Sequence, residues 1–139
     1  MNEFMKNFSL EGKIAFVTGA SYGIGFAIAS AYAAAGATIV FNDINQELVN
    51  KGLAAYEEKG IKAHGYVCDV TDEEQVQKMV AFVADTFGRL DCAYNNAGIM
   101  SDDVETAELE SAEFDRVMNI NLRSMFLCMK YELQQMLRQ

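Results

Sequence analysis

The chain has 139 residues, of which 51% are apolar and 22% are charged, a composition ordinary for a single globular domain. Its formal charge of −9 repels polyanions, so no nucleic-acid partner is expected. Residues 1–10 lack the apolar core of a signal peptide, and no apolar run reaches the roughly 18–20 residues that span a bilayer. We therefore expect a cytoplasmic protein without a membrane partner.

The cysteines and the single histidine give no sign of a metal site. Cys68, Cys92 and Cys128 are odd in number and widely spaced, and they form no C-x-x-C pair, which favours free thiols in a reducing compartment. His64 has no histidine or cysteine partner at metal-ligand spacing. No metal ligand is predicted.

A short apolar run, a turn and a helical stretch follow one another four times. The expected strands are 13–18, 38–42, 62–68 and 90–95, and the expected helices are 21–35, 45–59, 71–87 and 111–137. The apolar runs lack polar alternation, as in strands buried on both faces. This order predicts an α/β fold in one domain spanning 1–139, with a parallel sheet and helices on both of its faces.

The ends of these helices carry recognisable signals. Gly36, Gly60 and Gly88 are natural helix stops. Thr71 or Asp72 is expected to cap the third helix, with Glu74 three residues after Thr71 as in a capping box. In the last helix, residues at helical spacing are expected to share one face: Phe114, Val117, Met118, Asn121, Met125, Met129, Leu133 and Met136.

A glycine-rich segment, Thr18–Gly25 (TGASYGIG), stands between the first expected strand and helix. Glycines there permit a tight turn, close approach of a pyrophosphate and packing of helix on strand. The first amides of the helix then face the anion. The alternative is a tight turn without a ligand.

Asp43 ends the second expected strand. A carboxylate there accepts hydrogen bonds from the ribose hydroxyls of NAD and repels the 2′-phosphate of NADP. Neither Ile44 nor Tyr22 supplies a positive charge for that phosphate, so NAD is favoured, and NADP stays open. A capping or solvated aspartate is the alternative.

These residues resemble the classical short-chain dehydrogenases/reductases, whose glycine motif is TGxxxGxG. Cys68-Asp69-Val70 looks like the family's adenine site, and Asn95-Asn96-Ala97-Gly98 looks like its NNAG motif, which supports the sheet and the cofactor ribose. The segment 118–122 looks like the one that carries the helix asparagine, here Asn121. The stretch 8–68 looks most similar to gluconate 5-dehydrogenases.

The resemblance implies a Rossmann-type sheet, truncated after about four βα units, that binds a nicotinamide dinucleotide. The cofactor-binding residues it implies are Gly19, Ser21, Tyr22, Gly23, Ile24, Gly25, Asp43, Asp69, Val70, Asn96, Ala97 and Gly98. Asn121 would hold a water in a proton relay and is the one catalytic candidate. An ordinary structural amide is the alternative for Asn121.

The family's catalytic tyrosine is followed four residues later by a lysine, and this pair is absent from the chain. Four residues after the six tyrosines stand Phe26, Gly36, Gly60, Val70, Gly98 and Gln135. The resemblance therefore implies NAD(P)-dependent hydride transfer between an alcohol, such as a sugar acid, and its ketone, by an enzyme that this chain completes only in part.

Two kinds of partner follow from that reading. In the family's sheet the fourth strand is internal, so here it would be an edge that invites a second copy or a complementing C-terminal half. The alternative function is an engineered or truncated α/β fragment that self-associates and binds no ligand.

Overall fold

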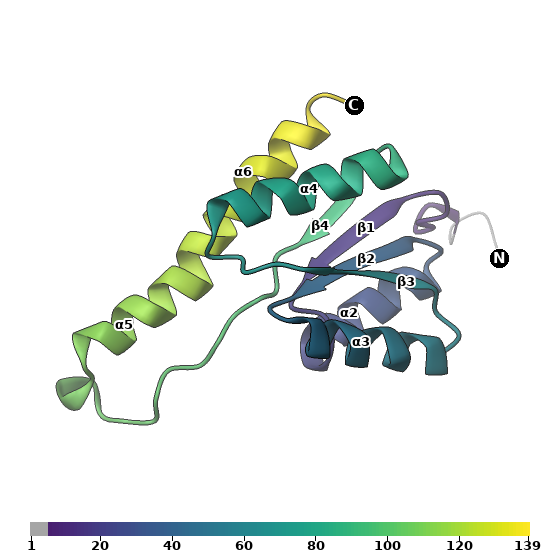
Figure 1. Cartoon of the computed structure of the whole chain (residues 1–139). Helices are drawn as coiled ribbons and strands as arrows, with labels where there is room; N and C mark the ends of the chain where they lie inside the picture. Colours follow the sequence, from purple (N-terminus) through teal and green to yellow (C-terminus); the bar gives the residue numbers. More distant parts are fainter. Residues whose placement is uncertain (1–5) are drawn as a thin grey trace.

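The computed structural model describes residues 6–139. Residues 1–5, which belong to the N-terminal segment that lacks the features of a signal peptide, lie outside the described part. Four parallel strands form one sheet in the order β3-β2-β1-β4 (Figure 1). In chain order the elements are β1 (Ile14–Thr18), α2 (Gly23–Ala34), β2 (Thr38–Asp43), α3 (Gln46–Glu58), β3 (Ala63–Val67), α4 (Glu73–Phe87), β4 (Cys92–Tyr94), the 3₁₀ turn η1 (Thr106–Glu108), α5 (Ser111–Met118), the π-helical turn η2 (Asn119–Arg123) and α6 (Ser124–Met136).

Helices cover both faces of the sheet, which confirms the expected α/β architecture. Residues of β1 alternate between two cores: Phe16 packs into a cluster with α4 and α6, and Ala15 and Val17 pack into a second cluster with α2 and α3. All five residues of β1 are buried. A strand covered on both sides has no polar face, which is why its sequence shows no alternation.

The expected helix ends are confirmed, with one change at α4. Gly88 adopts a left-handed conformation (φ 79°) directly after α4. Asp72 caps α4, because its carboxylate accepts the Gln75 amide. The expected capping box of Thr71 and Glu74 is wrong: the Thr71 hydroxyl instead donates to Asp69 Oδ1 at 2.7 Å.

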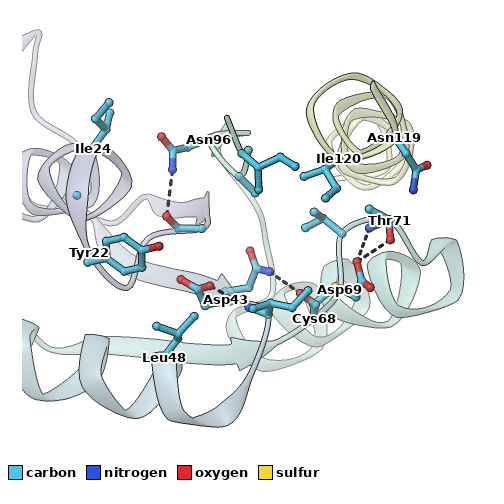
Figure 2. A pocket seen from close by; sticks show the side chains of 18 of the residues that line it. Tyr22, Ile24, Asp43, Leu48, Cys68, Asp69, Thr71, Asn96, Asn119 and Ile120 are labelled. Atoms are coloured by element: carbon cyan, nitrogen blue, oxygen red, sulfur yellow. Dashed lines mark hydrogen bonds between the residues drawn. The ribbon is translucent and has the colours of Figure 1, made fainter. Parts of the chain in front are cut away.

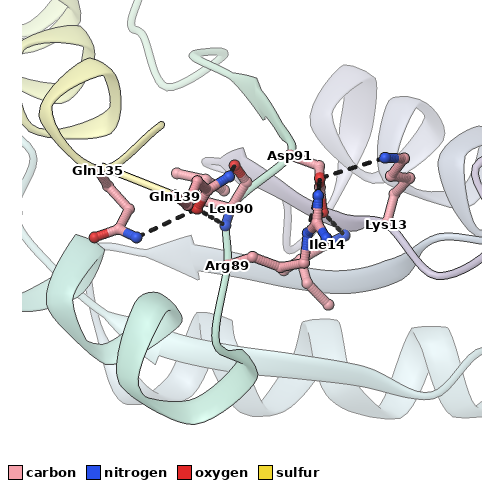
Figure 3. A network of polar contacts seen from close by, with 7 residues as sticks. All are labelled: Lys13, Ile14, Arg89, Leu90, Asp91, Gln135 and Gln139. Atoms are coloured by element: carbon pink, nitrogen blue, oxygen red, sulfur yellow. Dashed lines mark hydrogen bonds and ion pairs between the residues drawn. The ribbon is translucent and has the colours of Figure 1, made fainter. Parts of the chain in front are cut away.

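The strand β4 is shorter than expected and forms an edge of the sheet. A polar network fastens its base (Figure 3). Asp91 Oδ2 accepts the backbone N–H of Ile14 at 2.9 Å, and Lys13 and Arg89 form ion pairs with the same carboxylate. Since Ile14 begins β1 and Asp91 directly precedes β4, this contact holds the amino-terminal ends of the two strands together.

The last helix is continuous but contains a π-helical turn, η2, between α5 and α6, and its α5 end extends beyond the sheet (Figure 1). Several residues of the face predicted from helical spacing are exposed in the structure rather than packed against the sheet. Phe114, Met129 and Leu133 are 54%, 45% and 52% exposed, and the buried residues of α6 are Ser124, Leu127, Cys128 and Glu132. Apolar side chains occupy several sides of this helix, so periodicity alone does not select the side that meets α4.

No helix within residues 6–139 is both long enough and apolar enough to cross a membrane.

The packing of α6 predicts unequal effects for two leucines of the same helix. Leu127→Ala removes a side chain that is 1% exposed, and we expect it to lower the free energy of unfolding by about 2–5 kcal/mol. Leu133→Ala changes an exposed site and should alter it by no more than about 0.5 kcal/mol. Urea denaturation measures both, and equal losses would contradict the observed orientation of α6.

Candidate functional site

A pocket of about 520 Å³ opens at the carboxyl ends of β1 and β2. Tyr22 and Ile24 at the start of α2, Asp43 at the end of β2, Asn96 after β4 and Ile120 in η2 surround it (Figure 2). In parallel α/β sheets this end of the strands is where ligands bind.

Glycines let the glycine-rich loop after β1 and the segment 95–98 after β4 pack closely against each other at the carboxyl end of β1. A Cβ atom on Gly25 would stand 2.5 Å from Asn96 Nδ2 and 2.5 Å from the carbonyl oxygen of Gly19. Gly19 has a φ of +61°, and a Cβ there would stand 3.0 Å from Cα of Ala97. Both positions therefore require glycine for the segment 95–98 to reach its place.

The same crossing is fixed by hydrogen bonds from the segment 95–98 to the end of β1. Thr18 Oγ1 accepts the backbone N–H of Asn96 at 2.9 Å and that of Ala97 at 3.0 Å. The Asn96 side chain donates to the carbonyl oxygens of Thr18 and Gly19. These four bonds join parts of the chain that are 77–79 residues apart.

The N-terminus of α2 lines the pocket, and its N-cap residue provides no side-chain cap in the described part of the chain. The N-cap residue Tyr22 makes no side-chain hydrogen bond to the helix, and the first turn carries no acidic residue. Gly23 and Ile24 line the pocket. Their end of the helix dipole is positive, so this part of the pocket favours an anion.

The carboxylate of Asp43 lies beside the glycine-rich loop. Its Oδ2 accepts the backbone N–H of Ser21 at 3.3 Å, and its Oδ1 accepts the backbone N–H of Ile44 at 2.9 Å. Two buried polar atoms nearby have no partner in the described part of the chain: Ser21 Oγ and Asn42 Oδ1. Buried polar atoms are nearly always paired, so both atoms are free to bind a further polar group.

Asp69 and Val70 lie at the far wall of the pocket. Asp69 Oδ1 accepts both the backbone N–H and the hydroxyl of Thr71, at 2.9 and 2.7 Å. The carboxylate is thus held by its own turn, and both of these bonds use a single oxygen. The backbone N–H of Asp69 donates to Gln75 Oε1 at 3.0 Å, which ties the turn to α4.

Asn121 does not line the pocket but supports the segment that does. Its side chain accepts the Ile99 N–H and donates to the Ile99 carbonyl oxygen, both at 2.8 Å. A Cβ on Gly98 would stand 3.2 Å from Asn121 Oδ1. The side chain thus packs against this loop from the π-helical turn η2, and one amide hydrogen and one lone pair stay available for another partner.

The structure brings most of the predicted residues together. Those that line the pocket are Gly19, Tyr22, Gly23, Ile24, Asp43, Asp69, Val70, Asn96, Ala97 and Gly98. Ser21, Gly25 and Asn121 stand behind this lining and shape it.

Sequence reasoning did not single out nine further lining residues as site residues. They are Asn42, Ile44, Leu48, Cys68, Thr71, Ile99, Arg116, Asn119 and Ile120. Asn42, Ile44 and Cys68 are sequence neighbours of predicted site residues, so their position next to a motif could have predicted that they line the pocket. Arg116 carried no such signal, because it depends on where α5 lies across the pocket.

A glycine-rich loop, an uncapped helix N-terminus and a carboxylate at the ends of parallel strands are typical of dinucleotide-binding α/β proteins. Residues 13–139 match the family described as short chain dehydrogenase, and the chain belongs to this family.

Relatives of known name cover nearly all of the chain. A 2-dehydro-3-deoxy-D-gluconate 5-dehydrogenase of Formosa agariphila is 40% identical over 93% of this chain and 49% of its own length. A (+)-cis,trans-nepetalactol synthase of Nepeta racemosa is 44% identical over 92% of this chain and 48% of its own length. The chain spans about half the length of these relatives.

Solved structures also match almost all of this chain and about half of their own length. A 2-keto-3-deoxy-D-gluconate dehydrogenase from Streptococcus agalactiae superposes with a TM-score of 0.86 and 52% identity, over 99% of this chain and 52% of that one. An NAD⁺-bound xylitol dehydrogenase superposes with a TM-score of 0.87 and 39% identity, over 93% of this chain and 50% of that one.

The crossing of the two loops predicts a ranking of glycine substitutions. Gly25→Ala forces a Cβ against two polar atoms, and we expect it to lower the free energy of unfolding by about 3 kcal/mol or more. Gly23→Ala meets no atom within 4 Å and is strained only by its φ of +64°, so about 1–2 kcal/mol is expected. Urea denaturation of both variants tests the ranking, and its reversal would contradict the described crossing.

Proposed function

We propose that this chain forms the NAD-binding part of an oxidoreductase that transfers a hydride between an alcohol and its ketone. The observation that carries the proposal is the convergence of three groups on one pocket: the glycine-rich loop, the uncapped start of α2 and the Asp43 carboxylate. Family membership supports the cofactor class, because short-chain dehydrogenases use nicotinamide dinucleotides.

The donor and acceptor groups of the pocket fit such a cofactor. The amides of Gly23 and Ile24 suit the pyrophosphate, and Asp43 suits the adenosine ribose hydroxyls. Ser21, behind this lining, donates its backbone N–H to the same carboxylate and so helps to hold Asp43 in place. We assign the adenine ring to the wall of Asp69 and Val70, and the second ribose to the segment 96–98. The bound cofactor supplies the hydride, and these residues bind and orient it.

The charges around Asp43 support NAD over NADP. A 2′-phosphate next to this carboxylate would be repelled, and a site for it needs a cation. Arg116 is the one cation among the pocket-lining residues of the described chain, and its guanidinium already binds the Glu113 carboxylate at 2.7 and 2.8 Å. NADP is therefore the weaker ligand in our proposal.

For the substrate we propose a sugar acid. Two of the relatives carry names that specify a keto-deoxygluconate dehydrogenase, one in the sequence comparison and one among the solved structures. The identity of 52% with the solved enzyme supports this class over that of the nepetalactol synthase.

For catalysis we propose that the proton-transferring group comes from outside these residues. The chain contains no tyrosine followed four residues later by lysine, so it binds cofactor without turnover by itself. The relay role of Asn121 stays a prediction, and its hydrogen bonds to Ile99 support a positioning role. We propose that the exposed edge of β4 is where a complementing half or a second copy adds its strand.

Titration with NADH and NADPH, followed by cofactor fluorescence, tests the binding proposal. We expect saturable NADH binding, weaker NADPH binding, and a loss of about tenfold or more in NADH affinity in Asp43→Ala, because a charged acceptor for the ribose is removed. Asp103→Ala, an exposed carboxylate in the loop before α5, is the matched control and should bind as the parent does. A folded chain that binds neither cofactor would contradict the proposal.

A further inference from the structure

A carboxyl group on α6 is buried and forms no ion pair with any residue in the range 6–139. Glu132 of α6 is 3% exposed. Its Oε2 accepts the side-chain N–H of Asn95 at 2.8 Å, and its Oε1 has no hydrogen-bond partner within the described residues. Asn95 Oδ1, on the other half of the same amide, is also buried and unpartnered. One pair of side chains thus leaves two acceptors facing no donor.

One proton on the Glu132 carboxyl group would account for both unpartnered acceptor atoms, Glu132 Oε1 and Asn95 Oδ1. An ionised carboxylate only accepts hydrogen bonds, whereas a protonated one also donates. With a proton on Oε1, Glu132 would have a donor to offer Asn95 Oδ1, while Oε2 keeps the bond from Asn95 Nδ2. The two groups then form a closed pair with no orphaned acceptor, which is the arrangement that a buried polar pair requires.

The surroundings of Glu132 disfavour its charge. Burial raises the pKa of Glu132 above its ordinary value, and the hydrogen bond from Asn95 opposes this shift only in part. On α6, Cys128 interacts electrostatically with Glu132 and with Cys68, which follows β3. Burial raises the pKa of both thiols to about 12, so neither is charged at neutral pH.

Several charged groups on the elements packed around Glu132 are paired with other residues, and no ion pair within residues 6–139 includes Glu132. On α6, Lys130 and Tyr131 both bind the Glu73 carboxylate of α4. At the base of β4, Asp91 is paired with Arg89 and Lys13.

We propose that Glu132 keeps its proton in the folded protein, pairs reciprocally with the Asn95 side chain, and by this pair positions the segment 95–98 for cofactor. Asn95 directly precedes Asn96 and Ala97, whose backbone N–H groups bind Thr18 Oγ1. The pair therefore joins α6 to the loop crossing at the pocket. This positioning role rests on the proposed cofactor site, whereas the protonation does not.

The pair gives the fold a defined dependence on pH. A carboxyl group whose pKa is raised on folding stabilises the folded state fully below its unfolded value of 4.5, and this contribution is lost as pH rises through the raised folded value. Within that window the folding equilibrium constant falls by at most about tenfold per pH unit for one proton. At still higher pH, ionised Glu132 leaves Asn95 Oδ1 without a donor.

Glu132→Gln tests the protonation, because a glutamine amide donates and accepts at the same two positions at every pH. We expect its stability to equal that of the parent below pH 4.5 and to exceed it increasingly above, with the infrared carbonyl band of a protonated carboxyl present in the parent and absent in the variant. Glu58→Gln, at an exposed position of α3, is the control and should follow the parent. Parallel stability profiles for Glu132→Gln and the parent would overturn the protonated pair.

Glu132→Ala tests the positioning. We expect hydrogen exchange at the amides of Asn96 and Ala97 to accelerate about tenfold and NADH affinity to fall by a similar factor, with both restored in Glu132→Gln. Unchanged exchange at these two amides in Glu132→Ala would overturn the positioning role. If the parent itself binds no NADH, the proposed function fails, and the exchange rates and stability profiles still decide for or against the pair.

Discussion

The site depends on the hydrogen bonds by which the hydroxyl of Thr18, at the end of β1, holds the segment 95–98 that follows β4. This single oxygen accepts two backbone N–H groups from the segment after β4, while the Asn96 side chain binds the carbonyl oxygens beside it. The contact is possible only because Gly19 and Gly25 leave room where any side chain would collide. Sheet order, helix placement and the Asp91 network at the opposite end of β4 all serve to bring these segments together.

The chemistry of the pocket shows how a chain with a formal charge of −9 can offer a place to an anionic cofactor. Attraction comes from backbone amides at the start of α2, which carry partial positive charge that no count of side chains records. The Asp43 carboxylate lies close by, held by the amides of Ser21 and Ile44. In the proposed binding mode, the pyrophosphate and the ribose would therefore meet opposite electrostatic environments within one cavity.

Much of this arrangement could be predicted from the sequence, since its signals are local. Buried strands without alternation, glycine helix stops and the Thr18–Gly25 segment each depend on neighbouring residues, and the structure confirms the elements they predicted. The packed face of α6 could not be predicted, because Met129 and Leu133 are as apolar as Leu127, and contact with α4 decides which side is buried. Arg116 and the Glu132–Asn95 pair were missed for a related reason: both arise from contacts between elements far apart in the chain.

The central claim is that the pocket at the strand ends binds a nicotinamide dinucleotide through this chain's own residues. Amide chemical-shift mapping of the isotopically labelled chain, titrated with NAD⁺, tests it most directly because every lining residue reports separately. The account predicts saturable shifts at Gly23, Ile24, Ile44 and Val70, with no change in the groove between α4 and α6 near Ala84. Shifts confined to that groove, or none at all in a folded chain, would contradict the account.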